Sequence, residues 1–265
     1  MHTIAVINQK GGVGKTATTM NVGGALVELG YRVLLLDLDP QGHLTEACGV
    51  AEAEAPDTLA QILLGNIETL GVDETLRLVR PWRDRLDLIP TNIDAFLLER
   101  QLYRARAPEY RLQHVMDRLT QSDAWDVCLI DCPPSLGVLT DNALVCADQA
   151  LVPVQAEDST LRALRLLLEQ IKSARAELRT DIELLGMVVN LYDSRRGKIV
   201  TSVLDTLQNF PLDILATIED RAAIREAWRA GMPVVEHAPD STAAGRYREL
   251  AKRLTGAEVA QAGAL

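Results

Sequence analysis

The sequence predicts an α/β fold, with one domain built on a mostly parallel, twisted sheet that carries helices on both faces. Two observations lead to this prediction. Apolar runs rich in β-branched residues recur along the chain, and segments with helical spacing of apolar residues follow them. Strands that are apolar on both faces and alternate with helices form parallel sheets covered on both sides.

Seven segments are expected to form the strands of this sheet. They are residues 3–8, 32–39, 86–91, 126–131, 149–154, 182–190 and 213–218. No internal repeat, low-complexity linker or change in composition divides the chain. We therefore expect a single domain over residues 1–255 and a flexible tail over residues 256–265, where small residues offer little to pack.

The helices are expected between these strands. The first begins directly after residues 10–16 and ends before Gly30, a residue suited to a helix C-terminus, and Asp57 or Thr58 opens another. Two long segments, residues 159–178 and 241–254, carry apolar stripes that we interpret as core-facing rather than as partner-binding surfaces. The stripe residues are Leu161, Leu164, Leu168 and Ile171 in the first, and Tyr247, Leu250, Ala251 and Leu254 in the second.

Charge is distributed unevenly along the chain. The net charge is −10, which argues against coating DNA by bulk charge. Residues 1–160 hold 12 Lys and Arg against 23 Asp and Glu, whereas residues 161–265 hold 15 against 14. Any contact with a polyanion is therefore expected in the second part.

Composition also restricts location. No apolar run approaches the roughly 20 residues that a spanning helix needs, and no signal peptide precedes the first strand. The four cysteines contain no C-x-x-C pair, which favours buried free thiols. We expect a cytoplasmic protein.

A glycine-rich segment follows the first strand and leads straight into a helix. It reads Lys10-Gly11-Gly12-Val13-Gly14-Lys15-Thr16-Ala17. Glycines let backbone N–H groups converge on phosphate oxygens, and the helix N-terminus adds partial positive charge. Lys15 would contact the β- and γ-phosphates, and the Thr16 hydroxyl would bind Mg²⁺. The sequence therefore predicts a P-loop NTPase with ATP and Mg²⁺ as cofactors.

The second lysine at the start of this loop, Lys10, makes the segment resemble the deviant Walker A motif of the ParA/MinD family of P-loop ATPases. The resemblance continues at residues 37–42 (DLDPQG), 129–137 (LIDCPPSLG), 139–144 (LTDNAL) and 152–157 (VPVQAE), and again over residues 231–251. It covers nearly the whole chain and is specific to the ParA/Soj branch.

This resemblance implies how the site works. Lys10 matches the lysine that reaches the phosphates of a partner subunit, so that ATP binding favours a homodimer. Asp39 matches the residue that positions the attacking water. Lys10, Lys15 and Asp39 are thus the expected catalytic residues.

The resemblance also implies the metal and cofactor contacts. Asp131 matches the Walker B carboxylate, and Asp37 is expected to support the water shell of Mg²⁺. Thr16, Asp39 and Asp131 form the predicted magnesium set. Asn190, which ends a predicted strand, is expected to read the adenine edge. The alternative, that it only ends the strand as a turn residue, is nearly as well supported.

Two departures from the family pattern stand out. Ala17 replaces a threonine, which removes a hydroxyl contact to the α-phosphate and would weaken binding by roughly 1.5 to 3 kcal/mol. Residues 217–221 read TIEDR where Soj-like proteins usually carry I-P-R-N. In the family this segment lies near the nucleotide base and contributes to DNA contact, so both expectations have less support here.

The family's partition proteins bind DNA without sequence preference as ATP dimers, and a ParB-type adaptor triggers hydrolysis and release. A nucleoid-associated protein that segregates plasmids or chromosomes is the implied function. The expected DNA contacts are Arg195, Arg196 and Lys198 in one loop, with Arg221, Arg225 and Arg229 at helical spacing beyond it.

Other functions stay open within the same fold. A ParA-like ATPase that positions a protein cargo is the nearest alternative, and an ATP-dependent ligase or amidotransferase is a further one. A MinD-like membrane cycle needs a basic amphipathic C-terminal helix, which residues 257–265 do not resemble. An iron–sulfur carrier needs paired cysteines, and the spacing of the four cysteines here does not support one. We expect no membrane partner.

Overall fold

The computed structural model describes residues 1–50, 58–92, 94–157, 159–192, 198–219 and 222–256. Eight strands form one sheet in the order β3-β4-β2-β5-β1-β6-β7-β8, and all neighbouring pairs except β3 with β4 are parallel. The strands are β1 (His2–Val6), β2 (Val33–Asp37), β3 (Arg80–Arg83), β4 (Leu86–Ile89), β5 (Val127–Asp131), β6 (Gln149–Gln155), β7 (Glu183–Tyr192) and β8 (Ile214–Glu219). The predicted single-domain α/β fold with a mostly parallel sheet is confirmed.

One strand was not predicted. β3 is the antiparallel edge of the sheet, paired with β4 through Arg80 opposite Leu88. Its sequence, RPWR, has neither an apolar run nor a β-branched residue, so the pattern that identified the other seven is missing. Its two arginines and one proline are typical of an edge strand.

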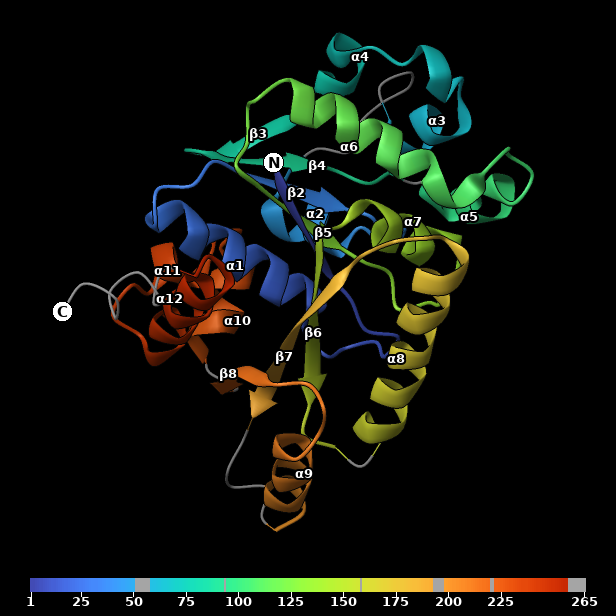
Figure 1. Ribbon diagram of the computed structural model, residues 1–265. Helices are drawn as coiled ribbons and strands as arrows, with labels where there is room; N and C mark the ends of the chain where they lie inside the picture. The colour runs from blue at the N-terminus through green and yellow to red at the C-terminus, as the bar shows by residue number, and fades with distance from the viewer. Residues whose placement is uncertain (51–57, 93, 158, 193–197, 220–221, 257–265) are drawn as a thin grey trace, which may run out of the picture.

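Helices cover both faces of the sheet (Figure 1). One face carries α1 (Lys15–Glu28), α2 (His43–Cys48), α10 (Ala222–Arg229), α11 (Val234–His237) and α12 (Thr242–Leu254). The other face carries α3 (Leu59–Leu64), α4 (Val72–Leu76), α5 (Ala95–Leu102), α6 (Arg111–Gln121), α7 (Val138–Cys146), α8 (Thr160–Glu177) and α9 (Lys198–Gln208). Single 3₁₀ turns lie at Ile67–Thr69 and Pro108–Tyr110.

Each face has its own buried apolar cluster. Leu34 and Leu36 of β2 point into one cluster, whereas Val33 and Leu35 point into the other, as strand alternation requires. Both sides of the central strands are therefore removed from water, which explains why their sequences are continuously apolar. The four cysteines are buried and free, as predicted.

Capping residues in the sequence predicted helix ends correctly. Gly30 follows α1 with φ 97°, a left-handed conformation that glycine adopts without strain. Thr58 caps α3, because its hydroxyl accepts a hydrogen bond from the backbone N–H of Gln61 at 3.1 Å. Gly256 lies just beyond α12, and residues 257–265 of the predicted tail are outside the described residues.

The core-facing stripe of α12 is confirmed at all four positions. The stripe of α8 needs one correction, since Leu167 is buried and Leu168 is half-buried. With Leu164 and Ile171 also buried, the true stripe follows i, i+3, i+7 spacing from Leu164. None of the described helices has the length and apolarity needed to cross a bilayer.

Candidate nucleotide-binding site

The predicted phosphate loop connects β1 to α1, at the carboxyl edge of the sheet. Gly12 and Gly14 have φ values of 74° and 87°, which side-chain-bearing residues rarely adopt. A Cβ at Gly14 would also lie 2.8 Å from the amide nitrogen of Asn190. Glycine at position 14 is therefore required both by conformation and by close packing.

Asn190 of β7 lies beneath this loop. Its side-chain nitrogen donates to the carbonyl of Val13 at 3.0 Å and to the hydroxyl of Thr18 at 2.9 Å. The residue is only 3% exposed. These hydrogen bonds hold the loop in place. The predicted adenine contact of Asn190 stays a prediction.

The loop forms one wall of a cavity of about 390 Å³. Its lining consists of Gly11, Gly12, Gly14, Lys15, Thr16, Ala17, Asp39, Gln41, His43, Pro134 and Trp228. Seven of these were predicted from the sequence as cofactor or metal contacts. Val13, also predicted, is buried at 1% exposure, so it can offer the cavity only its backbone.

Lys15 opens α1 and lies in the loop. It is 7% exposed, and its ammonium donates to the carbonyl of Lys10 at 3.3 Å. Burial lowers the pKa of Lys15, while the nearby Asp131, Cys132 and Asp39 act in the opposite direction. A bound polyphosphate would add negative charge here and favour the charged ammonium.

Lys10 has a different environment. It does not line the cavity, and its ammonium forms an ion pair with the carboxylate of Glu157. It also donates to the Ser159 hydroxyl at 2.9 Å. The backbone N–H of Lys10 donates to the side chain of Asn8 at 3.0 Å, which holds the start of the loop.

Three carboxylates gather at the ends of β2 and β5. Asp37 and Asp131 are register partners on these strands, and Asp131 is also opposite Val6 of β1. Both are fully buried, and among the described residues no hydrogen-bond partner reaches either oxygen of Asp131. Burial, with the charge of Asp37, raises the pKa of Asp131 well above its usual range, although Thr16 and Lys15 oppose the shift.

Asp37 and Asp39 differ in their partners. One oxygen of Asp37 accepts the backbone N–H and the hydroxyl of Thr45, at 2.8 and 2.7 Å. Burial raises the pKa of Asp37 to about 6, despite these bonds. Asp39 lines the cavity, and its Oδ1 accepts the N–H of Gln41 at 3.0 Å.

These groups fit a magnesium ion held partly through water and phosphate oxygens. The described residues contain no group of three His, Cys, Asp or Glu side chains that would hold a metal alone. Mg²⁺ at phosphates, however, usually keeps several waters and takes one or two protein oxygens. The unpartnered oxygens of Asp131, beside Thr16 and Asp39, match that requirement.

The predicted DNA contacts can be placed only in part. Arg195, Arg196 and Arg221 lie outside the described residues, as does the side chain of Lys198, the first residue of α9. Arg225 and Arg229 are exposed on α10. Their role in DNA binding stays a prediction.

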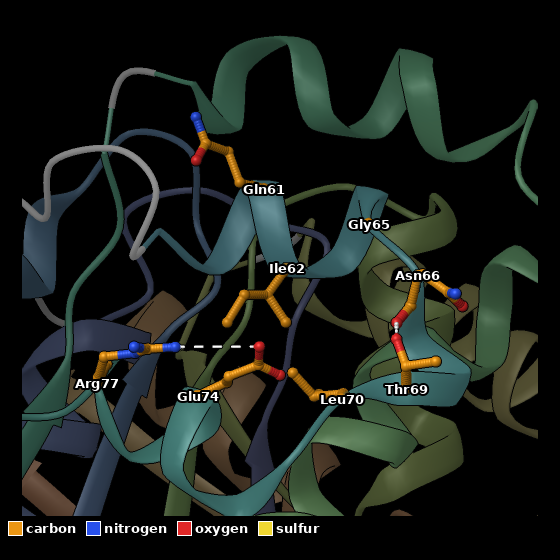
Figure 2. Close-up of a pocket in the computed structure, with 8 residues that line it drawn as sticks. All are labelled: Gln61, Ile62, Gly65, Asn66, Thr69, Leu70, Glu74 and Arg77. Carbon is orange, nitrogen blue, oxygen red and sulfur yellow. Dashed lines mark hydrogen bonds and ion pairs between the residues drawn. The ribbon is translucent and has the colours of Figure 1, made fainter.

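A second cavity, also of about 390 Å³, lies among α3, the 3₁₀ turn at Ile67–Thr69 and α4. Figure 2 shows Ile62 and Leu70 within it and the ion pair between Arg77 and Glu74 at 4.0 Å across it. Thr69 donates to the carbonyl of Asn66 at 3.2 Å. The polar groups of this second cavity thus include pairs that already bind one another. Asp131, the unpartnered carboxylate described above, is fully buried and does not line the first cavity.

Sequence reasoning gave no role to several residues of the site. On the cavity wall these are Gln41, His43, Pro134 and Trp228, and around it they are Thr45, Glu157 and Ser159. Glu157 and Ser159 lie after β6, and β6 lies beside β1 in the sheet. Trp228 comes from α10, more than 200 residues beyond the loop. The motif at residues 152–157 was a usable signal for Glu157, but none pointed to Trp228.

Comparison with known proteins gives consistent similarities. The AAA domain family matches residues 1–184. The sporulation initiation inhibitor protein Soj of Bacillus subtilis is 33% identical over 252 residues, covering 95% of this chain and 97% of that protein. The chromosome partitioning protein ParA of Caulobacter vibrioides is 34% identical over 259 residues, covering 97% and 95%.

A solved structure also resembles the chain. It is described as cobyrinic acid a,c-diamide synthase from Mycobacterium smegmatis with a bound ATP analogue and magnesium. The TM-score is 0.81 at 35% identity, and the match covers 96% of this chain and 94% of that one.

Proposed function

Because this chain belongs to the AAA domain family and, within it, to the Soj and ParA group of P-loop ATPases, we propose that its ATPase cycle drives DNA segregation. The protein is an ATPase with ATP and Mg²⁺ as cofactors. In the proposed cycle, two ATP-bound copies pair and bind DNA without sequence preference. A ParB-type adaptor then stimulates hydrolysis, which separates the copies from each other and from DNA.

The contrast between the two lysines of the loop carries this proposal. Lys15 is buried within its own loop, whereas Lys10 lies outside the cavity with 26% of its side chain exposed. An ammonium that does not face its own phosphates can neutralise those of a second subunit. ATP would then act as part of the interface, so pairing would require the triphosphate.

The chain's own residues supply the remaining parts. The loop glycines would present backbone N–H groups to phosphate oxygens, and Thr16, Asp39 and Asp131 would hold Mg²⁺, which neutralises phosphate charge. Asp39, at the cavity wall, would orient water for attack on the terminal phosphorus. Arg225 and Arg229 on each copy would contribute to a DNA-binding surface doubled by pairing.

The test is binding to random-sequence duplex DNA, measured by fluorescence anisotropy with a non-hydrolysable ATP analogue and with ADP. We expect binding with the analogue alone, weakening steeply between roughly 50 and 200 mM salt. Arg225→Ala should reduce the slope of log affinity against log salt by about one per lost phosphate contact. Arg104→Ala, an exposed arginine after α5, is the control. Equal binding with ADP, or binding indifferent to salt, would refute the DNA-binding part of the cycle.

A second candidate is an ATP-dependent amidation. The observation that favours it is the solved structure named as a cobyrinic acid a,c-diamide synthase, at 35% identity. That activity predicts ATP turnover stimulated by cobyrinic acid with an amide-nitrogen donor. Phosphate release measured with those substrates, and separately with DNA plus the adaptor, distinguishes the two functions.

A further inference from the structure

The lining of the nucleotide cavity combines two kinds of chemistry. The phosphate loop supplies backbone groups, the Lys15 ammonium and the Thr16 hydroxyl. Trp228 of α10 also lines the cavity, and it is the largest apolar side chain that does so. Nothing in the phosphate or magnesium chemistry uses an indole ring, so the role of Trp228 is separate from that of the loop.

The backbone that carries Trp228 is held from several directions. The N–H of Gly231 donates to the carbonyl of Trp228 at 3.1 Å, closing the turn after α10. The guanidinium of Arg83 donates to the carbonyl of Gly231 at 2.7 Å. Gly231 has φ 63°, and a Cβ there would lie 3.3 Å from the carbonyl of Ala47 in α2. The end of α10 is therefore fixed against α2 and β3.

Packing fixes the side chain as well. Trp228 is half-buried and packs against the apolar cluster on the α1 side of the sheet. Part of the indole is thus anchored in the core while part borders the cavity. An aromatic surface held in this way loses little freedom when a flat, apolar ligand group covers it.

The part of ATP that suits such a surface is the nucleoside. An indole cannot neutralise phosphate charge, but a purine stacks well on aromatic rings. Ala17, which lines the same cavity, gives the α-phosphate no hydroxyl. A contact from Trp228 to the nucleoside would offset that loss.

We infer that Trp228 is a specificity-determining residue of the nucleotide cavity, whose indole contacts the nucleoside and makes the site prefer nucleotides over bare polyphosphates. This rests on the proposed nucleotide binding but not on DNA binding or pairing. It assigns α10, which lies outside the recognised motifs, a direct part in holding the ligand.

The test compares MgADP with magnesium pyrophosphate, by calorimetry. Neither ligand has the γ-phosphate that the proposed pairing needs, so pairing does not interfere. Trp228→Ala should weaken MgADP binding roughly 5- to 100-fold and leave pyrophosphate binding within about twofold. Trp228→Phe, which keeps an aromatic face, should retain most of the MgADP affinity.

Intrinsic fluorescence supplies an independent measurement. MgADP should change the tryptophan emission of the unaltered protein and of Trp125→Phe, but not that of Trp228→Phe. Trp125 is a suitable control because it precedes β5, at the amino ends of the parallel strands, whereas the cavity lies at their carboxyl ends. Its Nε1 donates to Asp87 at 2.9 Å.

The outcomes separate the inference from the proposed function. If Trp228→Ala binds MgADP as well as the unaltered protein does, or loses both ligands equally, the nucleoside contact is wrong. If the unaltered protein binds neither MgADP nor MgATP, the proposed nucleotide switch itself fails.

Discussion

At the scale of single residues, Lys10 is held within its own chain by Glu157 and Ser159. These contacts compete with any contact that Lys10 makes to a second subunit, because one ammonium cannot occupy both places. The ion pair is partly exposed, with 26% and 44% of the two side chains accessible, so its stabilising contribution is small, about 0.2 to 1 kcal/mol. A restraint this weak would reduce the affinity of the proposed pairing without preventing it.

Replacing Glu157 tests this competition. Glu157→Gln should strengthen the dimer formed with a non-hydrolysable ATP analogue, lowering its dissociation constant roughly 2- to 10-fold, since two ion pairs no longer have to break. Sedimentation velocity measures the constant. Glu169→Gln, an exposed glutamate on α8, should leave it unchanged. A weaker dimer with Glu157→Gln would mean instead that Glu157 positions Lys10 for the partner.

The sequence predicted the residues of the loop but not the partners of Lys10. Loop glycines, Lys15 and Thr16 are adjacent along the chain, so their pattern can be read locally. Glu157 lies 147 residues from Lys10, and the two meet only because β6 pairs with β1. That pairing is a property of the folded sheet, which no local pattern specifies.

At the scale of elements, α1 is fixed to the C-terminal helices by close contact. Gly24 faces Pro233 just before α11, and a Cβ at Gly24 would lie 2.4 Å from the Cβ of Pro233. One turn earlier, the side-chain oxygen of Asn21 accepts the N–H of Val234 at 2.6 Å. This contact holds the helix that begins at the phosphate loop, so packing far from the cavity keeps the loop in position.

A pair of glycine substitutions measures how tight this contact is. Gly24→Ala should lower the free energy of unfolding by about 1 to 3 kcal/mol, because the added methyl overlaps Pro233. Gly245→Ala in α12 meets nothing within 4 Å and should be neutral or raise stability by up to about 1 kcal/mol. Urea titration gives both values. Equal effects of the two substitutions would contradict the packing argument.

Element prediction succeeded where apolar residues follow a regular period and failed where they do not. The other seven strands were located because each contains an apolar run, which burial on both faces explains for the strands inside the sheet. β3 was missed because Arg80, Pro81 and Arg83 suit an edge exposed to water. In α8, leucines at position 164 and at positions 166–168 left the facing residue ambiguous, and packing against the sheet selected Leu167.

At the scale of the whole molecule, strand order assembles the site. Because β5 lies between β1 and β2, the carboxylates that end β2 and β5 meet the loop that follows β1. Parallel strands direct all these ends to one edge of the sheet, where ligands bind in open α/β folds. The sequence indicated each part, and the resemblance to a known family supplied their arrangement.

In the proposed cycle, Asp39 determines how fast ATP is hydrolysed and therefore how long the dimer lasts. Asp39→Ala should slow phosphate release roughly 100-fold or more, because the one carboxylate of the three that lines the cavity is removed and can no longer orient water; MgATP should then hold the dimer for longer. Phosphate release and sedimentation measure the two effects. Asp123→Ala, with 96% of the Asp123 side chain exposed, is the control. Turnover at the normal rate in Asp39→Ala would show that another group orients the water.

The two outer strands of the sheet determine how copies of the chain can meet. Along β3, Pro81 has no N–H to donate, and its arginine neighbours disfavour a strand from another molecule. Along β8, the carbonyl of Leu215 already accepts the guanidinium of Arg253 at 2.8 Å. Lateral growth into a ribbon or fibril is thereby discouraged at both margins, so crowded copies can accumulate in a cell without joining sheet to sheet.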